Sequence, residues 1–186
     1  MKSKLLFAIA AATLPLGGGL SVSANPAPPV RPLVSQQPTS ANWQEFASND
    51  GKFAVLMPGV PEADSKTDPN GNVNHSFMLA LDEELYLINY FDFPEGFSAD
   101  SAQVRELLDT LPNSFAQGAS ARLVGDRNIT LDGHPGKEFQ FALANEQAPP
   151  GIGRLYLVDR RIYLAIAMTP QSQKAQRFLE SFRILS

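Results

Sequence analysis

Apolar and polar residues alternate with a period of two over much of this chain, which is the pattern of half-buried β-strands. In residues 77–81 every second side chain is large and apolar, and residues 85–91 carry apolar side chains on both faces. A strand that is apolar on both faces is predicted to lie centrally in a sheet that is covered on both sides. Short turn sequences separate neighbouring strands, as at 49–51 and 82–84, so consecutive strands are predicted to be antiparallel.

The period changes to that of a helix in two places. From Val104 to Leu111 apolar residues recur at i, i+3, i+4 and i+7. Asp100 is predicted to cap this helix, with Gln103 completing a capping box, and Pro112 is predicted to end or kink it. A second amphipathic stripe covers 175–182, after a cap predicted at Thr169-Pro170.

The resulting element order is β-β-β-β-α-β-β-β-β-α. The predicted strands are 43–46, 53–57, 77–81, 85–91, 121–131, 139–143, 155–158 and 162–168. A polar loop is expected between 58 and 72. This order predicts an α+β fold in which a mostly antiparallel sheet of about six to eight strands packs with two helices.

The N-terminal segment indicates in which compartment the protein is located. Lys2 and Lys4 precede an uncharged apolar run, and Val22-Ser23-Ala24 offers small residues for cleavage, so residues 1–24 are predicted to be a signal peptide. Residues 25–41 are rich in proline and are predicted to be a flexible linker. Residues 42–186 are predicted to form a single globular domain. The protein is therefore expected to be exported, to a periplasm or a thylakoid lumen.

Composition narrows the classes of partner. The chain has no cysteine, so neither disulfides nor cysteine-linked lipid are expected, and core packing must hold the fold. Removing residues 1–24 takes away two lysines and lowers the formal net charge from −4 to −6. An acidic chain without a cluster of lysine and arginine argues against nucleic acid as a partner. No later stretch is long and apolar enough to predict a transmembrane helix.

No catalytic or metal-binding motif stands out, and no cofactor is predicted. The two histidines, His75 and His134, are isolated in sequence and lack the spacing of zinc ligands. A hydrolase or ligand-binding site is left open as an alternative, assembled in space around the turn of His134 with Asp126 and Asp132.

A protein-binding surface is the site that the sequence favours, if the protein has one. Arginines and tyrosines gather on one predicted hairpin, and interface centres favour both residue types. An ordinary outer sheet face, with charges that limit edge pairing, explains the same residues. The candidate binding residues are Arg154, Tyr156, Arg160, Arg161 and Tyr163.

Several sequence segments resemble those of a group of small exported bacterial proteins that is common in cyanobacteria. The segments are Trp43 to Phe46, Asp50 to Pro61, Leu131 to Glu138, Arg154 to Tyr163 and Phe178 to Phe182. The element order is also similar to that of the PsbP-like fold, an antiparallel sheet between helices. The resemblance implies an α/β/α sandwich and an accessory role beside a membrane protein complex of photosystem type.

Together these observations predict an exported, non-enzymatic accessory or binding module that contacts a protein partner.

Overall fold

The computed structural model describes residues 42–68, 71–144 and 147–185. The predicted signal peptide and the whole of the predicted linker lie outside these ranges. The described part contains ten strands and two helices, and every strand pair is antiparallel. The predicted α+β class is therefore confirmed.

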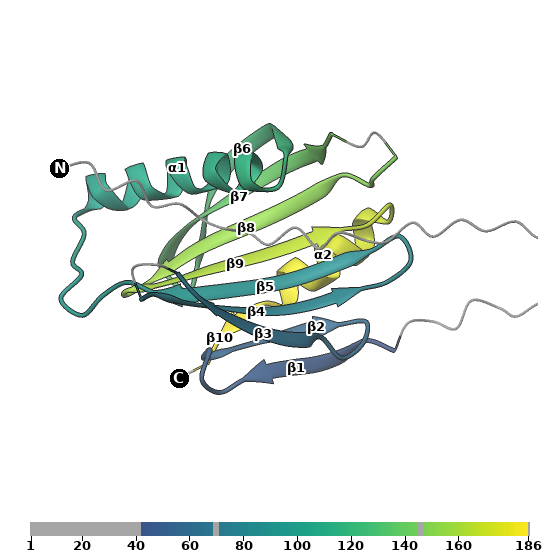
Figure 1. The fold of residues 1–186 in the computed structure, drawn as a ribbon, viewed down its shortest axis with the longest axis horizontal. Helices are drawn as coiled ribbons and strands as arrows, with labels where there is room; N and C mark the ends of the chain where they lie inside the picture. The colour runs from purple at the N-terminus through teal and green to yellow at the C-terminus, as the bar shows by residue number, and fades with distance from the viewer. Residues whose placement is uncertain (1–41, 69–70, 145–146, 186) are drawn as a thin grey trace, which may run out of the picture.

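The elements fall into two sheets (Figure 1). The larger sheet has seven strands in the order β3-β4-β5-β9-β8-β7-β6, and the smaller has three in the order β1-β2-β10. The strands are β1 (Gln44–Ser48), β2 (Phe53–Met57), β3 (Glu62–Thr67), β4 (Val73–Ala80), β5 (Leu85–Asp92), β6 (Ala121–Leu131), β7 (His134–Leu143), β8 (Gly151–Val158), β9 (Arg161–Met168) and β10 (Arg183–Ile184). The helices are α1 (Ser101–Gly118) and α2 (Ser172–Ser181).

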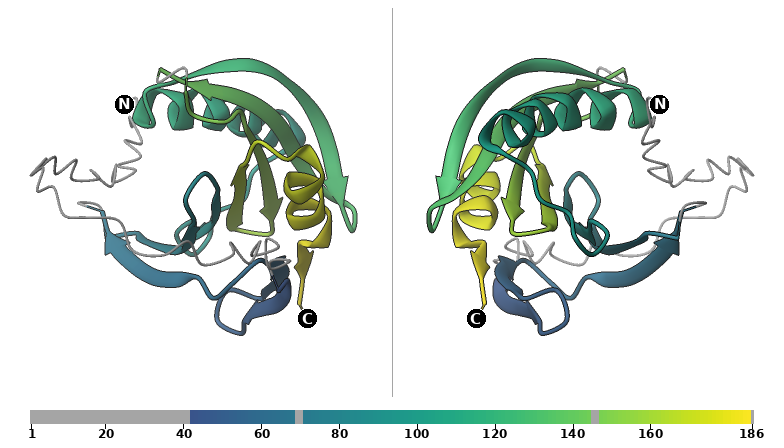
Figure 2. Two further views of the ribbon diagram at one scale, coloured as in Figure 1. Left: turned by 90° about the vertical axis from the view of Figure 1, so that its right-hand side faces the viewer. Right: turned by 90° about the vertical axis from the view of Figure 1, so that its left-hand side faces the viewer.

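The large sheet is covered differently on its two faces, as Figure 2 shows. Helix α1 packs on one face over β6, β7 and β8, and β6 arches over it. The other face packs against α2 and the small sheet, which cover the aromatic core around Phe53 and Phe178. Residues 85–91 of β5 contribute alternately to the two cores, as the apolar pattern on both faces predicted.

Helix α1 begins as predicted and ends later. Asp100 accepts hydrogen bonds from the backbone of Ala102 and Gln103, and the Gln103 side chain completes the capping box. Of the two predicted effects of Pro112, an end or a kink, the structure rules out the first, because the helix continues through Pro112 to Gly118. Phe115 and Ala116 are buried beyond the proline, and this packing holds the last turns in place.

Helix α2 begins two residues later than its predicted cap at Thr169 implied. Its N-cap is Gln171, which makes no capping bond with its side chain. Thr169 is buried, and its hydroxyl accepts a hydrogen bond from the Gln171 N–H at 3.1 Å. Thr169 thus supports the approach to the helix.

Two strands were not predicted. Residues 62–67 were expected to lie in a polar loop, yet they form β3, whose six residues are all exposed. Strand β10 has only two residues, which pair with Phe53 and Ala54 of β2. Together β1, β2 and β10 form the second sheet, which covers a face that the sequence assigned to a helix alone.

Two aromatic rings of β7 lie directly on glycines of β8. Phe139 pairs with Gly153 and Phe141 pairs with Gly151, and both rings also contact Phe115 of α1. A Cβ atom at Gly153 would collide with the Phe139 ring.

We expect Gly153→Ala to lower the free energy of unfolding by about 2 kcal/mol, because the Phe139 ring must be displaced within a packed core. Urea unfolding followed by circular dichroism measures this loss. Gly125→Ala is the matched control, since a Cβ there meets nothing within 4 Å. Equal stability of the two variants would contradict the close packing of Phe139 on Gly153.

Candidate functional site

Four chain segments meet at one end of the fold: the β1–β2 turn, the end of β5, the β8–β9 turn and the residues at and after β10 (Figure 1). A surface hollow between them has a volume of about 370 Å³. We call it the end hollow. Its charged lining consists of Lys52, Asp92, Asp159, Arg160 and Arg161, and its remaining lining of Val158, Tyr163, Ile184 and Leu185.

The tight β8–β9 turn places Arg160 beside the hollow. Asp159 adopts a left-handed conformation with φ 53°, which aspartate tolerates better than most residues. The Arg160 carbonyl accepts a hydrogen bond from the Phe93 N–H at 2.7 Å, and the Arg160 guanidinium donates to the Phe93 carbonyl at 2.7 Å. These two bonds fix the turn against the segment that follows β5.

Arg161 joins the two sheets at the same place. Its guanidinium donates to both carboxylate oxygens of Asp92, at 2.6 and 2.8 Å, and to the carbonyl of Asp50 at 2.8 Å. It also lies over the ring of Tyr90, 4.6 Å from the centroid. The hydrogen bond to Asp92 raises the pKa of Arg161, and the same bond lowers the pKa of Asp92. Arg161 and Asp92 are therefore a charged pair whose charges offset each other.

Arg160 differs from Arg161 in this respect. Its bond to Phe93 uses a neutral carbonyl, and no carboxylate among the described residues forms an ion pair with it. The end hollow therefore combines a cation available to a ligand with apolar side chains, an arrangement that suits an anionic group on an apolar segment.

The structure separates the five predicted binding residues. Arg160, Arg161 and Tyr163 line the end hollow together. Tyr156 is buried and stacks on Phe182 with ring centroids 5.7 Å apart. Arg154 donates to Glu138 at 2.8 Å and to the carbonyl of Leu179 at 3.0 Å, which ties β8 to α2.

Tyr156 and Tyr163 belong to the buried core and not to the surface. The Tyr163 side chain is 1% exposed, and its hydroxyl donates to the carbonyl of Gly51 at 2.7 Å. Burial raises the pKa of Tyr163 and of Tyr156. An exposed arginine–tyrosine face, as the sequence suggested, is therefore not what β8 and β9 present.

The alternative cluster around His134 is not assembled. Asp126 pairs with Phe139, which faces α1, whereas His134 lies an odd number of positions from Phe139 and faces the opposite side of the sheet. Lys137, which is buried, binds the carboxylates of Asp126 and Asp109 and so joins β6 and β7 to α1. Asp126 thus has a structural partner, away from His134.

One contact between chemically active residues was missed. The hydroxyl of Ser65 lies 2.8 Å from Nδ1 of His75, because the two residues are cross-strand partners on β3 and β4. The His75 ring stacks on Tyr90 at 4.6 Å, so one of its faces is covered. The contact was missed because residues 62–67 were expected to lie in a loop, which leaves Ser65 without a cross-strand partner. The bond lies on an exposed edge strand and acts as a cross-strand contact.

No protein-family model and no curated protein matches the chain. Among solved structures, the chain is similar to the solution structure of cyanobacterial PsbP (CyanoP) from Synechocystis sp. PCC 6803. The sequence identity is 14% and the TM-score is 0.48, and the match covers 83% of this chain and 99% of the other. The likeness concerns the fold alone, at the level that the sequence resemblance implied. Neither helix of the described part is long and apolar enough to cross a membrane.

Proposed function

We propose that this protein is an exported, non-enzymatic binding module that takes an acidic segment of a partner protein into the end hollow. The observation that carries the proposal is Arg160, whose positive charge borders apolar side chains and has no carboxylate partner among the residues described. Charge-assisted hydrogen bonds from a guanidinium to a carboxylate are among the stronger polar contacts. The apolar lining adds contact area that a free ion would not use.

Export of the module rests on the pattern of residues 1–24, and its accessory role on the sequence resemblance. The partner that we propose is an exposed subunit of a membrane protein complex, of photosystem type. Because the protein as a whole is acidic, its overall charge does not attract an acidic partner, and any attraction must come from Arg160 in the end hollow. Without residues 1–24 the protein has a formal net charge of −6, so it repels other acidic surfaces except where a cation is placed to receive them.

The test uses a short synthetic peptide of alternating glutamate and leucine as a defined acidic probe. We expect Arg160→Glu to weaken its binding by at least about tenfold in fluorescence anisotropy, because a like charge replaces the cation in the hollow. Arg122→Glu on the far edge strand β6 is the matched control, since it makes the same change of charge on an exposed side chain. Equal weakening by both variants, or none by either, would overturn the proposal.

A further inference from the structure

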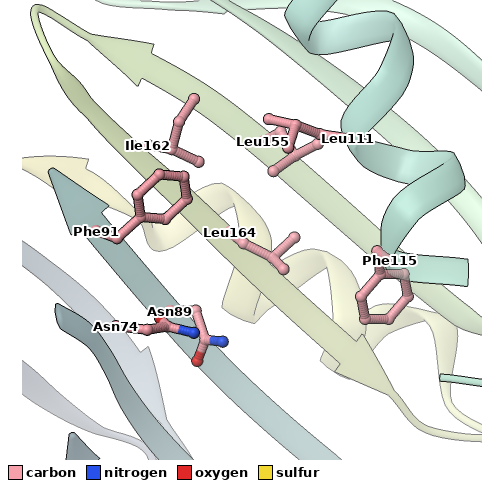
Figure 3. A pocket seen from close by; sticks show the side chains of 8 residues that line it. All are labelled: Asn74, Asn89, Phe91, Leu111, Phe115, Leu155, Ile162 and Leu164. Carbon is pink, nitrogen blue, oxygen red and sulfur yellow. The ribbon is translucent and has the colours of Figure 1, made fainter. Parts of the chain in front are cut away.

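Strand β3 forms one edge of the large sheet, beyond the part that helix α1 covers. The helix packs over β6, β7 and β8. A small pocket of about 30 Å³ between Phe115 of α1 and Asn74 and Asn89 of the sheet marks where this cover ends (Figure 3). β3 lies further out, next to β4, and all six of its residues are exposed. No strand of the described part of the chain pairs with its outer side.

An edge of this kind is a hazard, because its outward N–H and C=O groups can pair with the edge of a second copy. On the opposite edge of the sheet, the register of β6 shifts between Leu123 and Gly125, and such a bulge interrupts regular pairing. β3 has no such irregularity. Its six residues pair with β4 in one continuous register, and the strand contains no proline. A regular edge strand therefore needs protection of another kind.

One hydrogen bond shows which backbone groups of β3 point outwards. The N–H of Asp68 donates to the carbonyl of Asn72 at 2.9 Å, and this pair continues the register of β3 with β4. Hydrogen-bonded and non-hydrogen-bonded pairs alternate along an antiparallel ladder. Residues 62, 64 and 66 therefore direct their backbone groups towards β4, and residues 63, 65 and 67 direct theirs outwards. Ser65 is the central residue of the outward set.

The outward N–H of Ser65 already has an acceptor within its own strand. It donates to Oδ1 of Asp64 at 2.9 Å. The other oxygen of this carboxylate, Oδ2, lies 3.5 Å from Nζ of Lys66. Since the carboxylate binds a group that points outwards, it stands where an added strand would lie. An incoming strand must displace Asp64 before its own carbonyl can reach the N–H of Ser65.

We propose that Asp64 guards the free edge of the large sheet and keeps two copies of this protein from joining through β3. The pairing that it prevents is antiparallel, with a twofold axis at Ser65, because each copy offers the same outward groups. In that pairing Ser65 meets Ser65 of the second copy, and residue 63 meets residue 67. Both Asp64 carboxylates must be displaced, so the guard acts twice in each dimer.

Substitutions of Asp64 test the guard, with sedimentation equilibrium of the purified mature protein as the measurement. We expect the wild type to remain monomeric over the concentration series. Asp64→Ala should dimerise at least about tenfold more tightly than the wild type, because dimerisation no longer breaks two hydrogen bonds. Asp64→Asn is the matched control. It loses the same charge, yet its side-chain oxygen still accepts a hydrogen bond from Ser65, and so it should remain monomeric.

A cross-link locates the contact, because the chain has no cysteine of its own. Ser65→Cys places a single thiol at the expected twofold axis and leaves the backbone N–H in place. A short bis-maleimide should join two copies when Asp64→Ala is also present, and should not do so with Asp64→Asn. Both positions are exposed, so these substitutions leave the buried core unchanged.

Three results would overturn the proposal. Equal association of Asp64→Ala and Asp64→Asn would assign the resistance to charge and not to the hydrogen bond with Ser65. A wild type that dimerises as readily as Asp64→Ala would show that the edge is not guarded. A dimer of Asp64→Ala that is not cross-linked through residue 65 would place the contact on another surface.

Discussion

Replacing Phe53 with alanine is expected to lower the free energy of unfolding by about 4 kcal/mol. Phe53 is completely buried where the small sheet meets the large one. Its ring contacts five other aromatic rings, those of Phe46, Phe77, Tyr90, Tyr163 and Phe182. Truncation loses the transfer free energy of the ring and leaves a cavity that these rigid neighbours fill poorly. Since the free energy of unfolding of a domain is about 5–15 kcal/mol, a loss of this size removes a large fraction of the stability.

Urea unfolding monitored by the fluorescence of Trp43 measures this loss. Val60→Ala provides the comparison, because the Val60 side chain is 73% exposed and its truncation should change stability by no more than about 0.5 kcal/mol. If Phe53→Ala proved as mild as Val60→Ala, the small sheet would not be packed on the large sheet as described.

The parts of the fold that were predicted correctly are those with strong local patterns. The hairpin of β1 and β2, the capping box at Asp100 and the pairing of β8 with β9 follow from turn residues and from short-range periodicity. Each of these features is formed by residues close together in the sequence. Local chemistry therefore determined them without reference to the rest of the chain.

Strands β3 and β10 lack such a pattern. No residue of β3 is buried, so the hydrophobic alternation that reveals a strand is missing, and backbone pairing with β4 alone defines it. Strand β10 consists of two residues, and it exists because the end of α2 brings Arg183 and Ile184 alongside β2. Contacts between residues 54 and 183 leave no signal in a single sequence.

In the candidate site, too, the features set by local sequence were predicted and those set by tertiary packing were not. The β8–β9 hairpin was predicted, and Arg154, Arg160 and Arg161 lie on it as the sequence indicated. Alternation placed Tyr156 and Tyr163 on one face, yet it did not reveal that the second sheet and Phe182 cover that face. Lys52 and Ile184 join the end hollow from both ends of the domain. The composition of the hollow thus depends on tertiary packing, which the turn residues do not encode.

Arg161→Met is the second substitution with a large expected effect, a loss of about 3 kcal/mol in the free energy of unfolding. Methionine keeps an apolar side chain, but it removes the two hydrogen bonds to the partly buried carboxylate of Asp92. It also removes the hydrogen bond to the backbone carbonyl of Asp50. This value is at the low end for a broken ion pair, because both side chains retain some contact with water. The double variant with Asp92→Asn should lose less than the sum of the single losses, and strict additivity would contradict a direct coupling of Arg161 and Asp92.

The dependence of this loss on pH tests its electrostatic origin. The bond from Arg161 lowers the pKa of Asp92 below its unfolded value of about 3.9, so the unfolded state binds the proton more readily. The stabilisation from Asp92 is therefore complete above about pH 4 and disappears as the pH falls through the lowered pKa. Arg161→Met lacks this contribution at every pH, and so the stability gap between wild type and variant should narrow from about pH 7 to about pH 3. Glu84 and Glu138, whose pKa values are also lowered, are present in both proteins, so their effects cancel in the difference. A gap that stays constant over this range would assign the loss to the packing of Arg161 on Tyr90 and not to its charge.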